Sequence, residues 1–332
     1  MTRRRYLGGA FAGAVITAAA LAIAWSAAAS AARPTSIHPQ GPVHMMKPLS
    51  GSLHSAKGGH HGPPGGGGGS NNLSYHGGVG GVGVETAPQV YLVLWGSQWN
   101  NNDPSGEAAI LQGFLGDVGG SNWLNSVTQY CEGVKSGLSS CPGGSAFAGS
   151  NVVLAGTWFD TGSAAPARPK QSDLAAEAIN AAQNFGNTAP GSNDTTQYVI
   201  ATASGDNPSG FGRQYCAWHS YTSSSYGNVA YTNLPYITDA GASCGANFNG
   251  LGTTAGITIV AGHELAETIT DQFPSGGWLD ANGEENGDKC AWISSGQGAS
   301  ASVSFGSASY PVQSLWSNAA NSGAGGCVMS YP

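Results

Sequence analysis

Apolar side chains fill residues 90–95 without interruption, in a stretch of β-branched, aliphatic and aromatic residues that follows Pro88. A run of this length and composition predicts a strand that is buried on both faces. Shorter runs of the same kind predict further strands at 152–154, 198–202, 229–231 and 234–236, and short late strands around Val303, Phe305, Tyr310, Val312 and Leu315.

Between these runs, apolar residues recur at the spacing of a helix. The pattern predicts helices over 108–115, with Asp103 or Ser105 as the cap, over 123–130, over 174–185 behind a Ser172–Asp173 cap, and over about 254–270. Strands that alternate with helices and are joined by long glycine-rich loops indicate an α+β or α/β fold with a central sheet.

The first 84 residues have a different composition. Arg3, Arg4 and Arg5 precede an apolar run rich in alanine and then small residues, which predicts a signal peptide over 1–31 and export by the general secretory route or, given the paired arginines, the twin-arginine route. Residues 32–84 hold five consecutive glycines at 65–69 and six of the eight histidines. This composition predicts a flexible linker or a pro-segment.

The charge of the chain is divided just as sharply. All 18 acidic residues lie at or after Glu85, where only five basic residues occur, so residues 85–332 carry a net charge of −13. An acidic surface of this kind excludes nucleic acid and anionic membranes as partners and suits a cation ligand. We expect 85–332 to form one folded domain and a monomer, without stable membrane contact after cleavage.

Six cysteines lie in this acidic region, and an even number in an exported protein favours disulfides. Their spacing suggests the pairs Cys131–Cys141, Cys216–Cys244 and Cys290–Cys327, among fifteen pairings that the number alone allows.

The strongest chemical signal is the sequence His263-Glu264-Leu265-Ala266-Glu267 on the last predicted helix. His263 and Glu267 are four residues apart and therefore project from one face of a helix. Metallopeptidases of the H-E-x-x-H type use this layout for two metal ligands, with the intervening glutamate as general base on a water held by the metal. We therefore assign His263 and Glu267 as metal ligands and Glu264 as the catalytic base.

A catalytic zinc site needs a third protein ligand. The acidic loop 280–288 supplies two candidates, Glu285 and Asp288, which follow Glu267 by 18 and 21 residues. One histidine and two carboxylates would neutralise a divalent ion, and the sequence leaves open which of the two acids completes the set. A disulfide at Cys290 would hold the loop in place.

Other interpretations of these residues remain open. The helix motif is also compatible with a solvated surface patch. The alternating oxygen side chains of 280–288 suggest a calcium loop, although an EF-hand requires glycine where Glu285 stands and glutamate where Ala291 stands. The remaining histidine of the acidic region, His219, is interpreted as a residue that hydrogen-bonds within a disulfide-bearing loop, with oxyanion binding or metal ligation as alternatives.

The helix motif resembles that of zincin-type metallopeptidases. The stretch from Ala261 to Cys290, with Trp278 and the run Glu285-Asn286-Gly287-Asp288-Lys289-Cys290, is also similar to the phosphate-induced, EXORDIUM-like secreted proteins of plants. These proteins are extracellular and associated with growth and the cell wall. The resemblance implies that Glu267 belongs to the pattern and that Glu285 and Asp288 are its loop partners.

The sequence thus predicts a secreted, zinc-dependent hydrolase of zincin-like fold, most simply a peptidase acting on an extracellular peptide or cell-wall substrate. The alternative is a non-catalytic binding protein for the cell wall or carbohydrate, in which the metal is structural.

Overall fold

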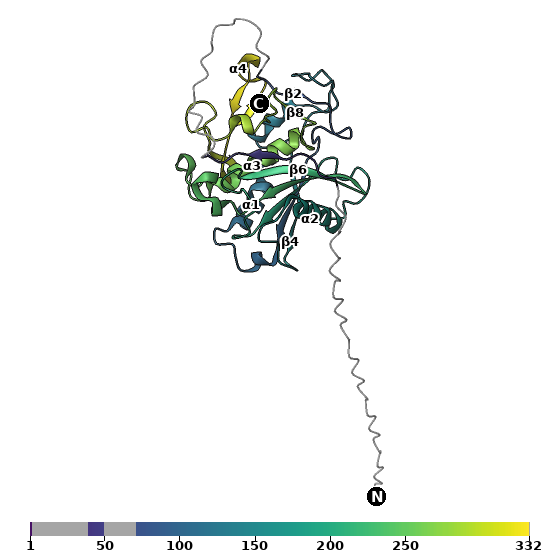
Figure 1. The fold of residues 1–332 in the computed structure, drawn as a ribbon, viewed down its shortest axis with the longest axis vertical. Coiled ribbons are helices and arrows are strands. Elements are labelled where there is room, and N and C mark those ends of the chain that lie inside the picture. The colour runs from purple at the N-terminus through teal and green to yellow at the C-terminus, as the bar shows by residue number, and fades with distance from the viewer. Residues whose placement is uncertain (2–38, 50–70, 332) are drawn as a thin grey trace. The chain divides into compact units, whose positions relative to one another are not determined.

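A six-stranded mixed sheet organises the part of the chain that the computed structural model describes, which comprises residues 1, 39–49 and 71–331 (Figure 1). The chain divides at residue 32 into two units, and all further description concerns the second, residues 33–332. The strand order is β1 (His44–Met46), β6 (Ala217–Ser224), β7 (Gly227–Leu234), β5 (Thr196–Thr202), β3 (Gln89–Trp95) and β4 (Val153–Asp160). The strands from β7 to β4 are parallel, whereas β6 is antiparallel to both of its neighbours.

Helices cover both faces of this sheet. Helices α1 (Glu107–Asp117) and α3 (Ala255–Thr270) contact one face, and α2 (Gln171–Asn184) contacts the other. In β3, Val90, Leu92 and Leu94 pack into the core on the α1 and α3 side, and the alternate residues, 91, 93 and 95, pack with α2. Side chains of a strand alternate between faces, so a strand covered on both sides is apolar at every position.

Helix α3 is buried along its whole length of 16 residues. It lies against the sheet on one side and against β10 (Ala308–Val312) on the other, and β10 pairs with β9 (Ala301–Phe305). A helix enclosed in this way is apolar around its circumference. The charged side chains that it does carry must therefore find partners inside the protein.

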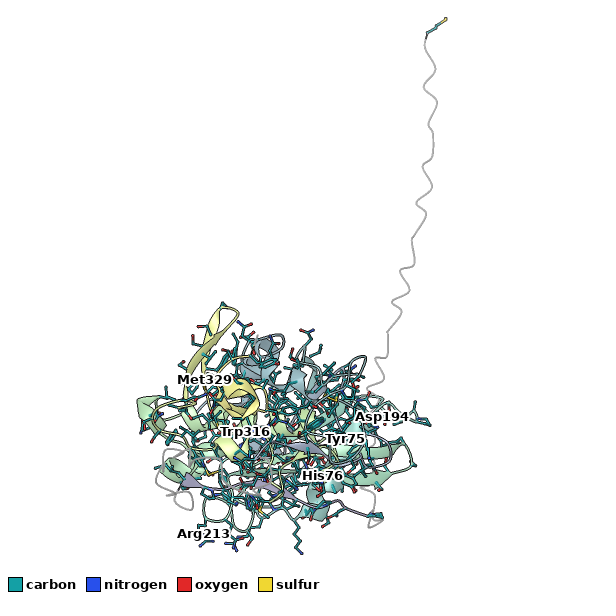
Figure 2. All side chains as sticks on the ribbon, turned by 90° about the horizontal axis from the view of Figure 1, so that it is seen from above. Tyr75, His76, Asp194, Arg213, Trp316 and Met329 are labelled. Atoms are coloured by element: carbon teal, nitrogen blue, oxygen red, sulfur yellow. A yellow bond between two sulfur atoms is a disulfide. The ribbon has the colours of Figure 1, made fainter. Side chains whose placement is uncertain are left out.

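Two small sheets and several short helices complete the fold. Strand β2 (Ser74–Tyr75) pairs with β8 (Trp278–Leu279), and β11 (Leu315–Ser317) pairs with β12 (Gly326–Val328). Tyr75 and Trp316, labelled in Figure 2, are buried in these pairs. The short helices are η2 (Ser97–Asn100), η3 (Leu124–Gln129), η4 (Ile237–Cys244), η5 (Phe248–Gly250), η6 (Asp288–Cys290) and α4 (Ala320–Gly323).

The predicted α+β organisation is confirmed in its broad form, as a mixed sheet with helices on both faces. The long helices are found where the periodicity placed them, and the Asp103 carboxylate accepts a hydrogen bond of 2.7 Å from the backbone nitrogen of Glu107 at the start of α1. The helix predicted over 123–130 is found as the 3₁₀ helix η3. Strands β6 and β12 were not predicted, and of 234–236 only Leu234 belongs to a strand.

The segment 32–84 differs from its predicted flexible state at two places. Residues 44–46 form edge strand β1 of the main sheet, and Met46 is fully buried in the core. Residues 74–75 form β2. The predicted signal peptide, apart from Met1, lies outside the described residues, as do 32–38 and 50–70.

All three predicted disulfides are confirmed, as Cys131–Cys141, Cys216–Cys244 and Cys290–Cys327. Disulfides of this kind are typical of an oxidising compartment. Among the described helices, none combines the length and the apolar composition that crossing a bilayer requires.

Candidate metal centre

The H-E-x-x-E motif lies in the middle of α3, and its three ionisable side chains are buried. His263 Nε2 lies 3.0 Å from Glu267 Oε1, as expected for residues one turn apart. The solvated surface patch that the sequence left open is therefore wrong. Neither His263 Nε2 nor Glu267 Oε2 has a hydrogen-bond partner, although both atoms are shielded from water. Unsatisfied buried atoms of this kind are what a missing cation would leave behind.

Asp288 joins these two residues from η6. Its Oδ1 atom lies 3.8 Å from His263 Nε2, and its backbone nitrogen donates a hydrogen bond of 2.8 Å to Glu267 Oε1. Donor atoms of His263, Glu267 and Asp288 all lie within 4.8 Å of one another. Gly287 makes this approach possible, because a Cβ atom there would lie 2.8 Å from both Glu267 Oε1 and His263 Nδ1.

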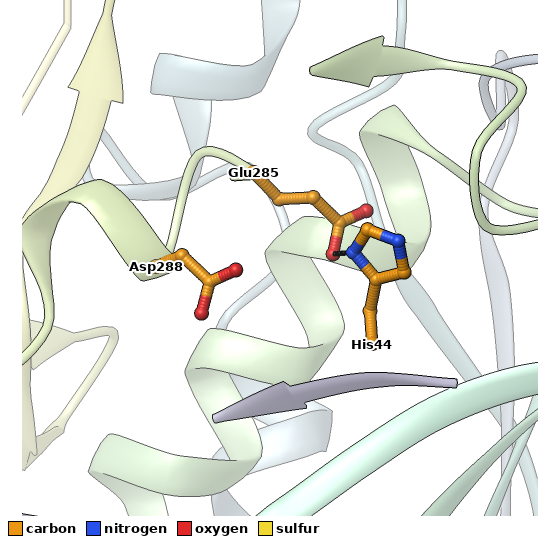
Figure 3. Close-up of side chains that lie close together, drawn as sticks. All are labelled: His44, Glu285 and Asp288. Atoms are coloured by element: carbon orange, nitrogen blue, oxygen red, sulfur yellow. Dashed lines mark ion pairs between the residues drawn. The ribbon is translucent and has the colours of Figure 1, made fainter. Parts of the chain in front are cut away.

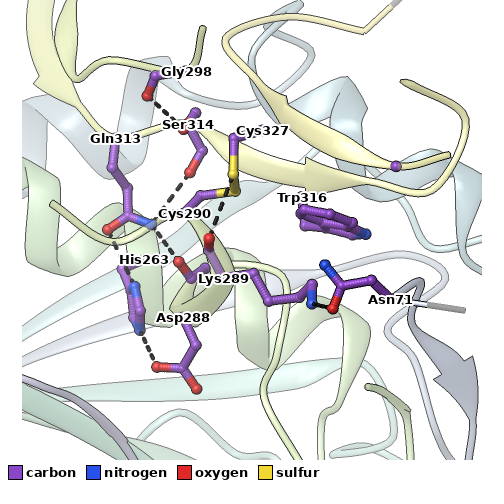
Figure 4. The surroundings of a disulfide bond; sticks show 12 residues. Asn71, His263, Asp288, Lys289, Cys290, Gly298, Gln313, Ser314, Trp316 and Cys327 are labelled. Atoms are coloured by element: carbon purple, nitrogen blue, oxygen red, sulfur yellow. Dashed lines mark hydrogen bonds and ion pairs between the residues drawn. A yellow bond between two sulfur atoms is a disulfide. The ribbon is translucent and has the colours of Figure 1, made fainter. Parts of the chain in front are cut away.

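Gln313 fixes the orientation of the His263 ring (Figure 4). The Gln313 amide nitrogen donates to the carbonyl of Gly287 at 2.7 Å, so its oxygen must face His263 Nδ1, at 3.2 Å. Because an amide oxygen only accepts, Nδ1 carries the proton and Nε2 keeps its lone pair in the neutral ring. This tautomer leaves Nε2 available as a metal ligand, in the manner of other metal-binding histidines.

Glu264 points toward the sheet and contacts His219 of β6. Its Oε2 atom lies 3.1 Å from His219 Nδ1, whereas its Oε1 atom is buried without a hydrogen-bond partner. The preferred interpretation of His219 as a loop residue is wrong, because His219 lies in a strand with its side chain fully buried beside Glu264. The antiparallel strand that positions it was not predicted from the sequence.

Glu285 contacts two other histidines, His219 and His44. Its Oε1 atom is 3.5 Å from His219 Nε2, and its Oε2 atom is 3.0 Å from His44 Nδ1 (Figure 3). Of the two candidate third ligands, the structure therefore brings Asp288 to His263 and places Glu285 with His44 and His219. Sequence reasoning did not single out His44, because one histidine of six in a low-complexity segment, all equally able to bind metal loosely, carries no distinguishing signal.

The charges of the cluster act strongly on one another. Burial disfavours the charged form of His263, but Glu267, Glu264 and Asp288 outweigh it and raise the pKa of His263 to about 10. At His44 burial is likewise outweighed, by Glu285, and its pKa rises to about 9. Burial raises the pKa of Asp288 to about 6, against the opposing effect of His263. The two histidine shifts share one cause, the negative charge of the surrounding carboxylates, which a cation would compensate.

In the loop 280–288, the first acidic residue, Asp280, has partners within the protein. The Asp280 carboxylate lies 2.7 Å from Lys289 Nζ and also accepts hydrogen bonds from the backbone nitrogens of Asn282 and Glu284. Although burial opposes ionisation, these contacts lower the pKa of Asp280. The Lys289 ammonium group thus balances the charge of Asp280, and calcium binding by the loop stays a prediction.

Comparisons of the chain with models of protein families, with curated proteins and with solved structures found no match. The zincin-like and EXORDIUM-like resemblances therefore stay predictions. What the chain does has to be argued from the geometry of its own residues.

Proposed function

We propose that this protein is a secreted, metal-dependent hydrolase, with the peptide bond as its substrate class. The observation that carries the proposal is the meeting of α3 and η6: donor groups of His263 and Glu267 on α3 converge with that of Asp288 on η6, and Glu264 lies one residue after His263. One neutral imidazole and two carboxylates suit Zn²⁺, and they balance its charge.

The chain supplies the groups that hydrolysis requires. His263 Nε2, Glu267 and Asp288 would hold the ion, which when bound acts as a Lewis acid that polarises a carbonyl and lowers the pKa of water. Glu264 would accept a proton from the attacking water at Oε1, the carboxylate atom without a hydrogen-bond partner, and pass it to the departing amine. His219 Nδ1 holds the other oxygen of Glu264 and so fixes the orientation of the base.

Replacing Glu264 by glutamine tests the mechanism, because it keeps the shape of the side chain and removes its basicity. We expect at least a 100-fold loss of peptide hydrolysis, the typical contribution of a general base, with zinc content unchanged. His263→Ala should lose both zinc and activity. Activity of the purified protein on a library of quenched fluorescent peptides, with zinc measured by mass spectrometry, distinguishes these outcomes; wild-type turnover by E264Q would end the proposal.

One observation favours the second candidate, a non-catalytic binding protein with a structural ion. The His263, His219 and Glu267 side chains have no exposed surface, whereas His44 and Asp288 side chains are 15% and 16% exposed. Substrate would thus have to approach past β1 and η6. Water proton relaxation of the Mn²⁺-loaded protein separates the two candidates. An exchanging water on the ion supports the hydrolase, and a fully enclosed ion supports the structural role.

A further inference from the structure

We propose that the centre binds two divalent ions, with the second held by His44, Glu285 and Asp288. Donor atoms of these three residues lie within 4.8 Å of one another (Figure 3). The inference rests on the proposed function for the first ion, because Asp288 belongs to both donor sets. His263 and Glu267 complete the first set, and His44 and Glu285 complete the second.

The backbone itself places His44 at the centre. His44 of β1 and His219 of β6 are directly opposite each other in the antiparallel register, so both side chains leave the same face of the sheet. Their ring centroids are 5.9 Å apart. The next residue, Met45, is 43% exposed, and Met46 is buried, which is the alternation expected of a strand with its inner face toward α3.

Glu285 supplies the independent sign of a ligand. Its side chain is fully buried, and neither oxygen receives a well-directed hydrogen bond. The two imidazole nitrogens nearest to it lie at 3.0 Å and 3.5 Å. Backbone and amide groups usually satisfy a buried carboxylate, whereas the contacts of this carboxylate are with two imidazoles, the side chains that most often share a metal ion with carboxylates. A cation between Glu285, His44 and Asp288 would satisfy the carboxylate.

The charge of the whole cluster agrees with two ions. When the imidazoles are neutral, as metal-bound ligands are, the four carboxylates of Glu264, Glu267, Glu285 and Asp288 carry up to four negative charges, twice what one divalent ion supplies. A carboxylate shared between two ions is also the usual architecture of two-metal hydrolases, in which the ions lie about 3.5–4 Å apart. Asp288, which belongs to both sets, is the bridging residue.

Metal stoichiometry tests the proposal on the purified exported chain. Apo-protein reloaded with Zn²⁺ or Mn²⁺ should bind two equivalents per chain, and the Mn²⁺ form should give the electron paramagnetic resonance signal of an exchange-coupled pair. His44→Ala should bind one equivalent and give an uncoupled signal. The matched control is His76→Ala, a change at the surface histidine of the same N-terminal region, which should keep both ions.

The outcomes separate this inference from the proposed function. One equivalent in the wild type, lost in His263→Ala, overturns the second site and leaves the hydrolase proposal intact. Two equivalents that persist in His44→Ala also overturn it. No binding in the wild type refutes both. Two equivalents reduced to one by His44→Ala establish the second site even if no peptide is cleaved.

Discussion

The buried carboxyl group of Glu107, away from the metal centre, shows how burial alone changes the protonation of a side chain in this fold. Glu107 opens α1 with its side chain 1% exposed, and its Oε1 atom accepts a hydrogen bond of 3.0 Å from the backbone nitrogen of Ile237. Its Oε2 atom has no hydrogen-bond partner. Burial therefore dominates and raises the pKa of Glu107 to about 8. No metal contact complicates this residue, so it offers a clean test of the electrostatics.

The stability of the protein should fall as the pH rises through the range set by Glu107. Above about pH 4.5 the unfolded state loses this proton, while the folded state keeps it up to about pH 8. Because each pKa unit corresponds to about 1.4 kcal/mol, the wild type should lose roughly 2 kcal/mol relative to Glu107→Gln between pH 5 and pH 7. Urea unfolding measures this difference. Glu284→Gln, at a side chain that is 43% exposed, is the control, and equal pH slopes for E107Q and wild type would contradict the assignment.

At the scale of elements, the sequence predicted those strands and helices in which apolar residues recur at the regular spacing of the element. The uninterrupted apolar run of β3 and the helical spacing of α1, α2 and α3 were readable because each follows from burial of a face. Strand β6 was not readable, since five of its residues 217–224 are histidine, serine or threonine and form no apolar run. His219 was misassigned for the same reason.

Of the candidate metal centre, the sequence predicted the residues that lie close together in the chain. His263, Glu264 and Glu267 share one turn of α3, so local spacing revealed them. Asp288 and Glu285 could be proposed only as alternatives, because the path of a loop depends on tertiary contacts such as that between Gln313 and Gly287. His44 lies 219 positions before His263 in the numbering of the chain, and only the pairing of β1 with β6 brings it near.

The disulfide Cys290–Cys327 anchors η6, the short helix that begins at Asp288 and ends at Cys290. It should therefore help to hold the Asp288 carboxylate near His263. Replacing both cysteines by alanine should lower stability by about 4 kcal/mol for a closed loop of this length, and should weaken zinc binding roughly 10- to 100-fold, as loss of supporting contacts does. The pair Cys131–Cys141 is the control: its removal should cost about 3 kcal/mol and leave zinc affinity unchanged. Competition with a chromogenic chelator measures the zinc affinity, and thermal unfolding measures the stability. Equal zinc affinities in the two variants would contradict the inference that this disulfide holds Asp288 in place.

For the whole molecule, the cluster links metal binding to folding. Parts of the chain far apart in sequence, β1, β6, α3 and η6, meet at one buried cluster of imidazoles and carboxylates. An ion bound to the folded state alone therefore stabilises all of these elements together. The three disulfides reduce the conformational entropy of the unfolded chain, but they do not compensate the buried charge of the cluster.

Chelation should accordingly lower the melting temperature. With zinc at 100 times its dissociation constant, binding contributes about 2.7 kcal/mol, and a domain of this size shifts by roughly 2–4 °C per kcal/mol, so removal by EDTA should lower Tm by roughly 5–10 °C. Differential scanning calorimetry at fixed pH measures the shift. His263→Ala, which lacks a ligand of the first ion, should show a smaller response to EDTA than the wild type, and an unchanged Tm in the wild type would mean that no ion contributes to its stability.

Strand β1 also has a consequence for how this protein can be handled. It covers the outer side of β6, whose backbone groups would otherwise face solvent along the rim of the sheet. A shortened form that begins after residue 49, as the glycine-rich composition invites, would present that rim to other chains, and uncapped rims of this kind recruit foreign strands and aggregate. Expression should therefore begin upstream of residue 39.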